Sequence, residues 1–165
     1  MVRADWTIYE EDYWAINSVL KELIDNSNST SVLLIDKTGQ LIASVGMEPE
    51  FDLMSFASLC AADFEANAQL ATLIGEKDFS TLYHQGVDES MYLSRVAQHI
   101  ILVVLFNKRT TLGLVRLRVK KAVDNLDTVL NRLFHKLEYE NEDLKQFDKG
   151  FADELNKEID SLFKD

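Results

Sequence analysis

Few residues of this 165-residue chain have the types and spacing that chemistry requires. His84, His99 and His135 lie on different predicted elements, and no cysteine or carboxylate pair accompanies them at the spacing of zinc ligands. Cys60 is the single cysteine, and its apolar neighbours on a predicted helix are typical of a buried, unreactive thiol. We therefore expect neither a metal site nor thiol chemistry, and the histidines are interpreted as exposed or core-edge residues.

One short motif has a known use in phosphoryl transfer. Asp36-Lys37-Thr38-Gly39 matches the start of the loop in which P-type ATPases phosphorylate an aspartate. Those pumps need membrane spans and a nucleotide domain, for which this chain has no room. The simpler interpretation is a turn at the end of a strand, with Gly39 available for a positive φ. The sequence contains no glycine-rich phosphate loop and no nucleophile elbow, so we expect function by binding, without a cofactor.

Composition and charge narrow the class of protein. Hydrophobic residues make up 47% of the chain, which is enough for the core of one compact domain. A net charge of −11 argues against nucleic acid and anionic lipid as partners, since both are polyanions. The longest apolar run, Ile100 to Phe106, is far shorter than the roughly twenty residues that span a bilayer. A single cysteine and no basic-then-apolar N-terminal segment predict a cytoplasmic protein.

The spacing of apolar residues predicts an α+β protein with three helices and five strands. The predicted helices cover residues 9–26, 52–74 and a long segment from residue 110 to about 137, and the predicted strands cover residues 32–35, 41–45, 79–85, 90–96 and 100–106. This order favours an α/β sandwich with a single five-stranded antiparallel sheet, the second helix on one face and the other two on the opposite face. Residues 100–106 are apolar throughout, which predicts a central strand.

The second helix carries two largely apolar stripes and so indicates two packing partners. One stripe contains Phe56, Leu59, Asp63, Asn67, Leu70 and Ile74, and the other contains Leu53, Ala57, Ala61, Phe64, Ala68 and Ala71. The strand at 79–85 is expected at an edge of the sheet, where unpaired backbone groups favour pairing with another chain. We therefore predict a homodimer whose interface includes Ala57, Phe64, Ala68, Ala71, Leu82 and Tyr83.

Two charged regions have an open interpretation. The basic cluster of Arg116, Arg118, Lys120 and Lys121 is either a solvated helix side or a dock for an acidic partner or for the protein's own tail. Arg109 lies in a predicted loop, and nothing marks it as an arginine finger.

The C-terminal residues 138–165 are predicted to be an acidic tail, separate from a domain at residues 1–137. The tail holds ten acidic and four basic residues. Its apolar residues fall on one stripe of a short amphipathic helix and form a candidate partner motif of Phe151, Leu155, Ile159, Leu162 and Phe163. The alternative is that this stripe folds back onto its own domain, beside Arg116 and Lys120.

Several longer segments carry a family resemblance. Val32 to Ile42, Ala57-Ser58-Leu59, Leu73 to Glu76, His84-Gln85-Gly86 and Arg109 to Ala122 resemble the roadblock/dynein light chain family. Within that family they are most similar to the MglB group of bacterial gliding-motility and polarity proteins. The resemblance covers about residues 8 to 135, and the Arg109 to Ala122 segment is the most specific part of it.

The resemblance implies a roadblock fold and a homodimer that binds one molecule of a Ras-like GTPase of the MglA type. It further implies faster GTP hydrolysis without an arginine finger, because the activator reorients the GTPase's own catalytic residues, and a role in cell polarity and gliding motility that can concentrate the protein at a cell pole. The implied GTPase-binding residues on the second helix are Ala61, Ala62, Glu65, Gln69 and Thr72.

One departure from the family pattern leaves an alternative open. MglB proteins tend to carry small residues on the helix stripe that faces the GTPase, whereas this chain has Glu65 and Gln69 there. Longer side chains predict either a retuned GTPase contact or a roadblock scaffold that binds without accelerating hydrolysis. A small-molecule sensor is disfavoured, because the central strand and third helix present no isolated inward polar group.

Overall fold

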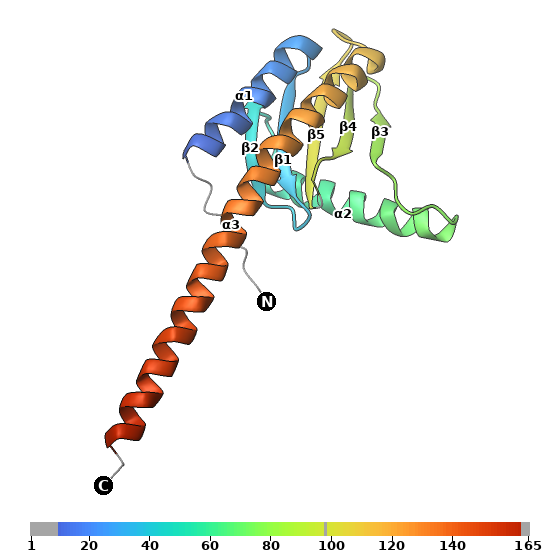
Figure 1. The fold of residues 1–165 in the computed structure, drawn as a ribbon. Coiled ribbons are helices and arrows are strands. Elements are labelled where there is room, and N and C mark those ends of the chain that lie inside the picture. Colours follow the sequence, from blue (N-terminus) through green and yellow to red (C-terminus); the bar gives the residue numbers. More distant parts are fainter. Residues whose placement is uncertain (1–9, 98, 163–165) are drawn as a thin grey trace. The chain divides into compact units, whose positions relative to one another are not determined.

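The computed structural model describes residues 10–97 and 99–162, and its elements follow the predicted order (Figure 1). The described helices and strands are α1 (Glu10–Ser27), β1 (Ser31–Asp36), β2 (Leu41–Gly46), α2 (Leu53–Leu73), β3 (Thr81–Gln85), β4 (Glu89–Arg95), β5 (Ile100–Asn107) and α3 (Leu112–Leu162). The predicted α+β class and roadblock-type element order are confirmed.

The five strands form one antiparallel sheet in the order β2-β1-β5-β4-β3. Strand β5 is central, pairs with β1 and β4, and is buried at almost every position, as its unbroken apolar sequence predicts. Strand β3 lies at one edge and pairs only with β4, for example Leu82 opposite Leu93. Most of its residues are exposed, and among the described residues one side of its backbone has no strand neighbour.

Helices cover both faces of the sheet (Figure 1). Side chains alternate along each strand, and Leu33, Ile35 and Val103 pack with α2 in one core cluster. The intervening buried residues, such as Leu34 and Leu102, point to the opposite face. That face is covered by α1, which lies against β1 and β2, and by the first part of α3.

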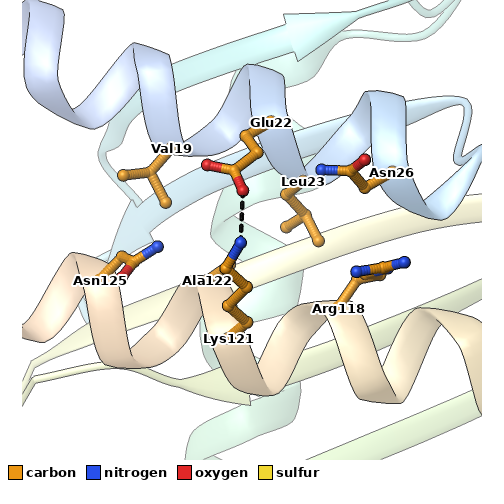
Figure 2. A pocket seen from close by; sticks show the side chains of 8 residues that line it. All are labelled: Val19, Glu22, Leu23, Asn26, Arg118, Lys121, Ala122 and Asn125. Carbon is orange, nitrogen blue, oxygen red and sulfur yellow. Dashed lines mark hydrogen bonds and ion pairs between the residues drawn. The ribbon is translucent and has the colours of Figure 1, made fainter.

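A polar contact joins α1 to α3 at the surface of this layer. Figure 2 shows Lys121 reaching across to Glu22, where its Nζ donates a hydrogen bond to Glu22 Oε1 over 2.7 Å. This hydrogen bond and the charge of Lys121 hold the pKa of Glu22 below its usual value. Both side chains are exposed, so the ion pair contributes little to stability.

The turn between β1 and β2 uses the Asp36 carboxylate for structure. Its Oδ1 accepts hydrogen bonds from the Thr38 amide at 2.8 Å, the Thr38 hydroxyl at 2.7 Å and the Gln40 amide at 2.9 Å. Gly39 adopts a φ of 86°, which L side chains rarely adopt. The turn interpretation of this motif is therefore confirmed, and the phosphoryl-transfer interpretation has no support.

Helix α3 differs from its sequence-based boundaries. The sequence predicts a long helix to about Leu137 and a separate short helix after an acidic run, but α3 is one helix from Leu112 to Leu162. The intervening glutamate, lysine and leucine residues favour helix, and Gly150 alone costs only about 1 kcal/mol. The chain divides into two compact units between Leu130 and Asn131, both of which contain part of this helix. Within the described residues, no helix combines the length and apolarity needed to cross a membrane.

Candidate functional site

Helix α2 is held against the sheet by its alanine-rich stripe. Ala57, Ala61 and Ala71 are buried with Cys60 and Phe64, so small side chains let the helix lie close to β1, β4 and β5. Asp52 caps the N-terminus by accepting hydrogen bonds from the backbone amides of the first turn. The sheet covers one side of α2, and the β1–β2 turn lies close to Ser58 near its N-terminal end. Two other sides of the helix stay exposed.

Cys60 belongs to this buried layer. Burial raises the pKa of its thiol to about 11, and the negative charge of Asp63 adds to the shift. The thiol is therefore protonated and unreactive near neutral pH, in agreement with its predicted inert role.

The first flank of α2 is polar and exposed. Ala62, Glu65, Gln69 and Thr72 recur at spacings of three and four and lie on one side of the helix. Gln69 Nε2 donates a hydrogen bond to Glu65 Oε1 over 3.1 Å, which holds the two long side chains together. We call these four residues the polar flank. They form an exposed surface with hydrogen-bonding groups.

A cavity of about 240 Å³ lies beside the polar flank. Its lining brings together Lys37 from the β1–β2 turn, Arg95 from β4, His99 from the β4–β5 turn and Glu65 from α2. The Arg95 guanidinium also lies 5.4 Å from the centre of the Phe64 ring. Two cationic side chains, Lys37 and Arg95, thus lie around the one carboxylate of the lining, so this end of the sheet can accept acidic or hydrogen-bonding side chains of a partner.

The second flank of α2 faces the β3 edge and is apolar. Asp63 Oδ2 lies 2.6 Å from His84 Nε2 of β3, which places this side of the helix beside the edge strand. On the same side, Leu59, Leu70 and Ile74 are 69%, 54% and 70% exposed. We call these three residues the apolar flank. Large apolar side chains grouped beside an edge strand are typical of a protein interface.

The structure places the predicted dimer residues at several depths. Ala57 and Phe64 are buried in the core cluster with the chain's own sheet, and Ala71 is also buried, whereas Ala68 and Leu82 are half-buried. Tyr83 is exposed on β3 and stacks on Phe106, with ring centres 6.2 Å apart. The apolar flank was recognised in the sequence as part of a stripe but was not included among the interface residues. Its signal was a second largely apolar stripe on a helix that packs on the sheet through the first one.

The predicted GTPase-binding residues divide in a similar way. Ala61 lies on the side of α2 that packs against the sheet and is buried in the core cluster there. The remaining four form the polar flank. They are therefore the part of that predicted set that a partner can contact directly.

The basic cluster on α3 also divides. Lys121 is paired with Glu22, and the buried Nε of Arg118 has no hydrogen-bond partner among the described residues. Arg116 and Lys120 are exposed and line a groove of about 610 Å³. Lys121 therefore fits the interpretation of a solvated helix side. Arg116 and Lys120 border a concave surface instead, as a dock for an acidic segment would require.

Part of the C-terminal motif is described. Phe151, Leu155 and Ile159 are exposed on α3, as the predicted amphipathic stripe requires. Leu162 is the last described residue, its side chain is not among those described, and Phe163 lies outside the described residues. In residues 10–97 and 99–162, no three His, Cys, Asp or Glu side chains are grouped so that they could hold a metal ion.

Comparison with known proteins places this geometry in a family. Residues 15–106 match the model of the Roadblock/LC7 domain. The structure is similar to Myxococcus xanthus MglB, with 44% identity, a TM-score of 0.73 and coverage of 77% of this chain and 96% of that one. It is also similar to the gliding protein MglB of Thermus thermophilus, with 29% identity, a TM-score of 0.74 and coverage of 79% and 99%. An MglB described as having a tetrameric arrangement matches at 29% identity, a TM-score of 0.74 and coverage of 80% and 99%.

Proposed function

This chain belongs to the Roadblock/LC7 family and is similar to its MglB proteins, and from that membership we propose that it regulates a Ras-like GTPase of the MglA type. The proposed regulator acts as a homodimer, binds the GTPase and accelerates GTP hydrolysis. The biological role that follows is control of cell polarity and gliding motility. The protein is not itself a catalyst with its own active site in this proposal.

The observation that carries the proposal is the division of α2 into two exposed flanks. The apolar flank lies beside the β3 edge, so a second copy can cover it while extending the sheet. The polar flank then remains open for a different partner. One helix therefore supports both the dimer and the GTPase contact, without competition between the two.

The proposed mechanism needs only positioning. Phosphoryl transfer is accelerated by orienting the attacking water and stabilising the charge that develops on the phosphate. A rigid surface that holds the GTPase in one arrangement can orient the GTPase's own catalytic groups. Glu65 and Gln69 are held together by their hydrogen bond and anchored on a helix packed against the sheet, so they are suited to this positioning role.

Reversing the charge of Glu65 should weaken GTPase binding without destabilising the fold. Glu65 is exposed, so Glu65→Lys removes no buried contact, but it breaks the hydrogen bond from Gln69 and places a cation beside Lys37 and Arg95. We expect the dissociation constant to rise about ten-fold and to depend on salt. Calorimetry with an MglA-type GTPase at two salt concentrations measures it.

Glu76→Lys is the matched control, because Glu76 is also exposed but lies beyond the end of α2. The control should bind like the unmodified protein, and both variants should melt at an unchanged temperature. Equal weakening by both substitutions would show a general charge effect and would remove the polar flank from the proposed interface.

Deleting residues 148–165 should change GTPase regulation and leave the folded dimer intact. We propose that Phe151, Leu155, Ile159, Leu162 and Phe163 form a detachable binding segment. The segment belongs to the tail that is expected to follow the domain after residue 137. Three of these side chains are exposed, so their removal costs no core packing. Thermal melting, light scattering and GTP hydrolysis on the shortened protein test this. A loss of several kcal/mol in stability with unchanged regulation would assign the segment to the core.

A roadblock scaffold is the second candidate function. The favouring observation is that Glu65 and Gln69 make the polar flank bulkier than the small residues expected in an activator. A scaffold would bind the GTPase through the same flank and leave its hydrolysis rate unchanged. Binding and hydrolysis measured on the same pair of proteins distinguish the two functions.

A further inference from the structure

A groove lies between the first part of α3 and the edge of the sheet, on the face opposite α2. It has a volume of about 610 Å³ and is lined by Thr81 of β3, Tyr92 and Ser94 of β4, and Leu117 and Val123 of α3, among others. Leu117 is 62% exposed, although Val115 and Val119 on the same helix are buried. The groove therefore presents apolar surface to solvent where β3 and β4 extend beyond the helices.

The charge around this groove is positive. Arg116 and Lys120 are four residues apart on α3 and border it, and in the part of the chain that the structure describes neither forms an ion pair. Arg95 is at the opposite wall and is paired with Asp78, and Asp124 is the one carboxylate in the lining. In a chain with a net charge of −11, an apolar groove with two unpaired cations selects an acidic amphipathic segment.

The chain itself contains a segment of that chemistry. Residues 138–162 hold nine acidic and three basic residues, a net charge of −6. Phe151, Leu155 and Ile159 are spaced four apart and project from one side of the helix, exposed by 59%, 46% and 44%. An amphipathic helix of this kind binds by laying its apolar side into a groove.

Charge also decides which surface this segment meets. Two copies of it side by side would bring together two strongly acidic helices, which repel each other. The groove offers opposite charge and apolar area together.

We propose that the groove at Arg116, Leu117 and Lys120 of one copy receives the apolar stripe at Phe151, Leu155 and Ile159 of a second copy. This inference rests on the proposed role of the C-terminal segment as a binding element, but not on GTPase activation. Its consequence is regulatory: a segment held in the groove is withheld from other partners, so copies of the protein compete with those partners for it.

Disulfide trapping between full-length chains tests the proposal. Leu117→Cys protein is mixed with Leu155→Cys protein under mild oxidation, and Cys60 does not interfere because it is buried. A mixed disulfide between the two variants is expected. The control exchanges Leu155→Cys for Tyr139→Cys, which is exposed on the same helix but sixteen residues earlier and away from the stripe. The mixed disulfide should form at least about ten-fold more slowly in this control pair.

Charge reversal and rescue sharpen the test. Adding Arg116→Glu and Lys120→Glu to the groove chain should lower the trapping rate about ten-fold, since two ion pairs become two repulsions. Adding Glu154→Lys and Glu158→Lys to the other chain should restore it. All four residues are exposed, so melting temperatures should be unchanged. The proposed docking would be rejected by a trapping rate equal to that of the Tyr139→Cys control, or by a rate that neither pair of charge reversals changes.

The outcome is separable from the proposed function. GTP hydrolysis is measured on the chain that carries Arg116→Glu and Lys120→Glu, since neither residue lies on the polar flank. A trapping rate that falls with the groove substitutions and recovers with the segment substitutions supports docking in the groove, even where the unmodified protein fails to stimulate GTP hydrolysis. Loss of charge dependence in trapping rejects the groove even where stimulation is normal.

Discussion

Leu70→Arg should convert the protein from a dimer to a monomer and abolish its effect on the GTPase. Leu70 is half-exposed in the single chain, so the substitution removes no core contact. In the proposed dimer the new guanidinium is buried without a partner, which costs about 3–5 kcal/mol. That cost weakens association by a factor of about 1,000. Light scattering at micromolar concentration should give the 18.9 kDa mass of one chain for the variant and twice that mass for the unmodified protein.

Gln69→Arg is the matched control for this experiment. It places the same side chain at the neighbouring position, on the polar flank of the same helix. The control should remain dimeric. A dimeric Leu70→Arg protein with unchanged affinity would show that the apolar flank is not the interface, and an unmodified protein that is monomeric would reject the dimer altogether.

Gly39→Ala should destabilise the fold by about 3 kcal/mol. A Cβ at this position would lie only 2.6 Å from the Cα of Ser58 in α2, and the φ of 86° adds backbone strain. The turn and α2 would have to separate, and this turn also carries Lys37 to the cavity beside the polar flank. Urea unfolding measures the loss.

Gly75→Ala isolates the two causes. Gly75 has a similar φ of 81°, but nothing lies within 4 Å of the added Cβ. The control should lose only about 1 kcal/mol, from backbone strain alone. Equal losses at the two glycines would contradict the close approach of the turn to α2.

The fold could be predicted from local sequence patterns because those patterns are strong here. The uninterrupted apolar run at Ile100 to Phe106 identified the central strand, and the helix predicted at residues 52–74 agrees closely with α2. Gly39 was recognised as a turn residue. Its contact with Ser58 was not predictable, because it depends on how a turn and a helix meet in space.

The surfaces were harder to predict than the elements. Periodicity separated the two stripes of α2, but it could not tell which stripe packs on the chain's own sheet. The alanine stripe does so, which buries Ala57 and Ala61 and leaves Leu59 and Leu70 exposed. The end of α3 was also misjudged, because an acidic run was interpreted as a boundary although its residues favour helix.

The rate of GTP hydrolysis by an MglA-type GTPase tests the central proposal most directly. It is measured under single-turnover conditions alone, with the unmodified protein and with Leu70→Arg. The proposal predicts that the unmodified protein raises the rate by at least about ten-fold, a lowering of the barrier by about 1.4 kcal/mol, and that Leu70→Arg does not. An unchanged rate with a GTPase that binds the unmodified dimer would contradict activation and leave the scaffold function.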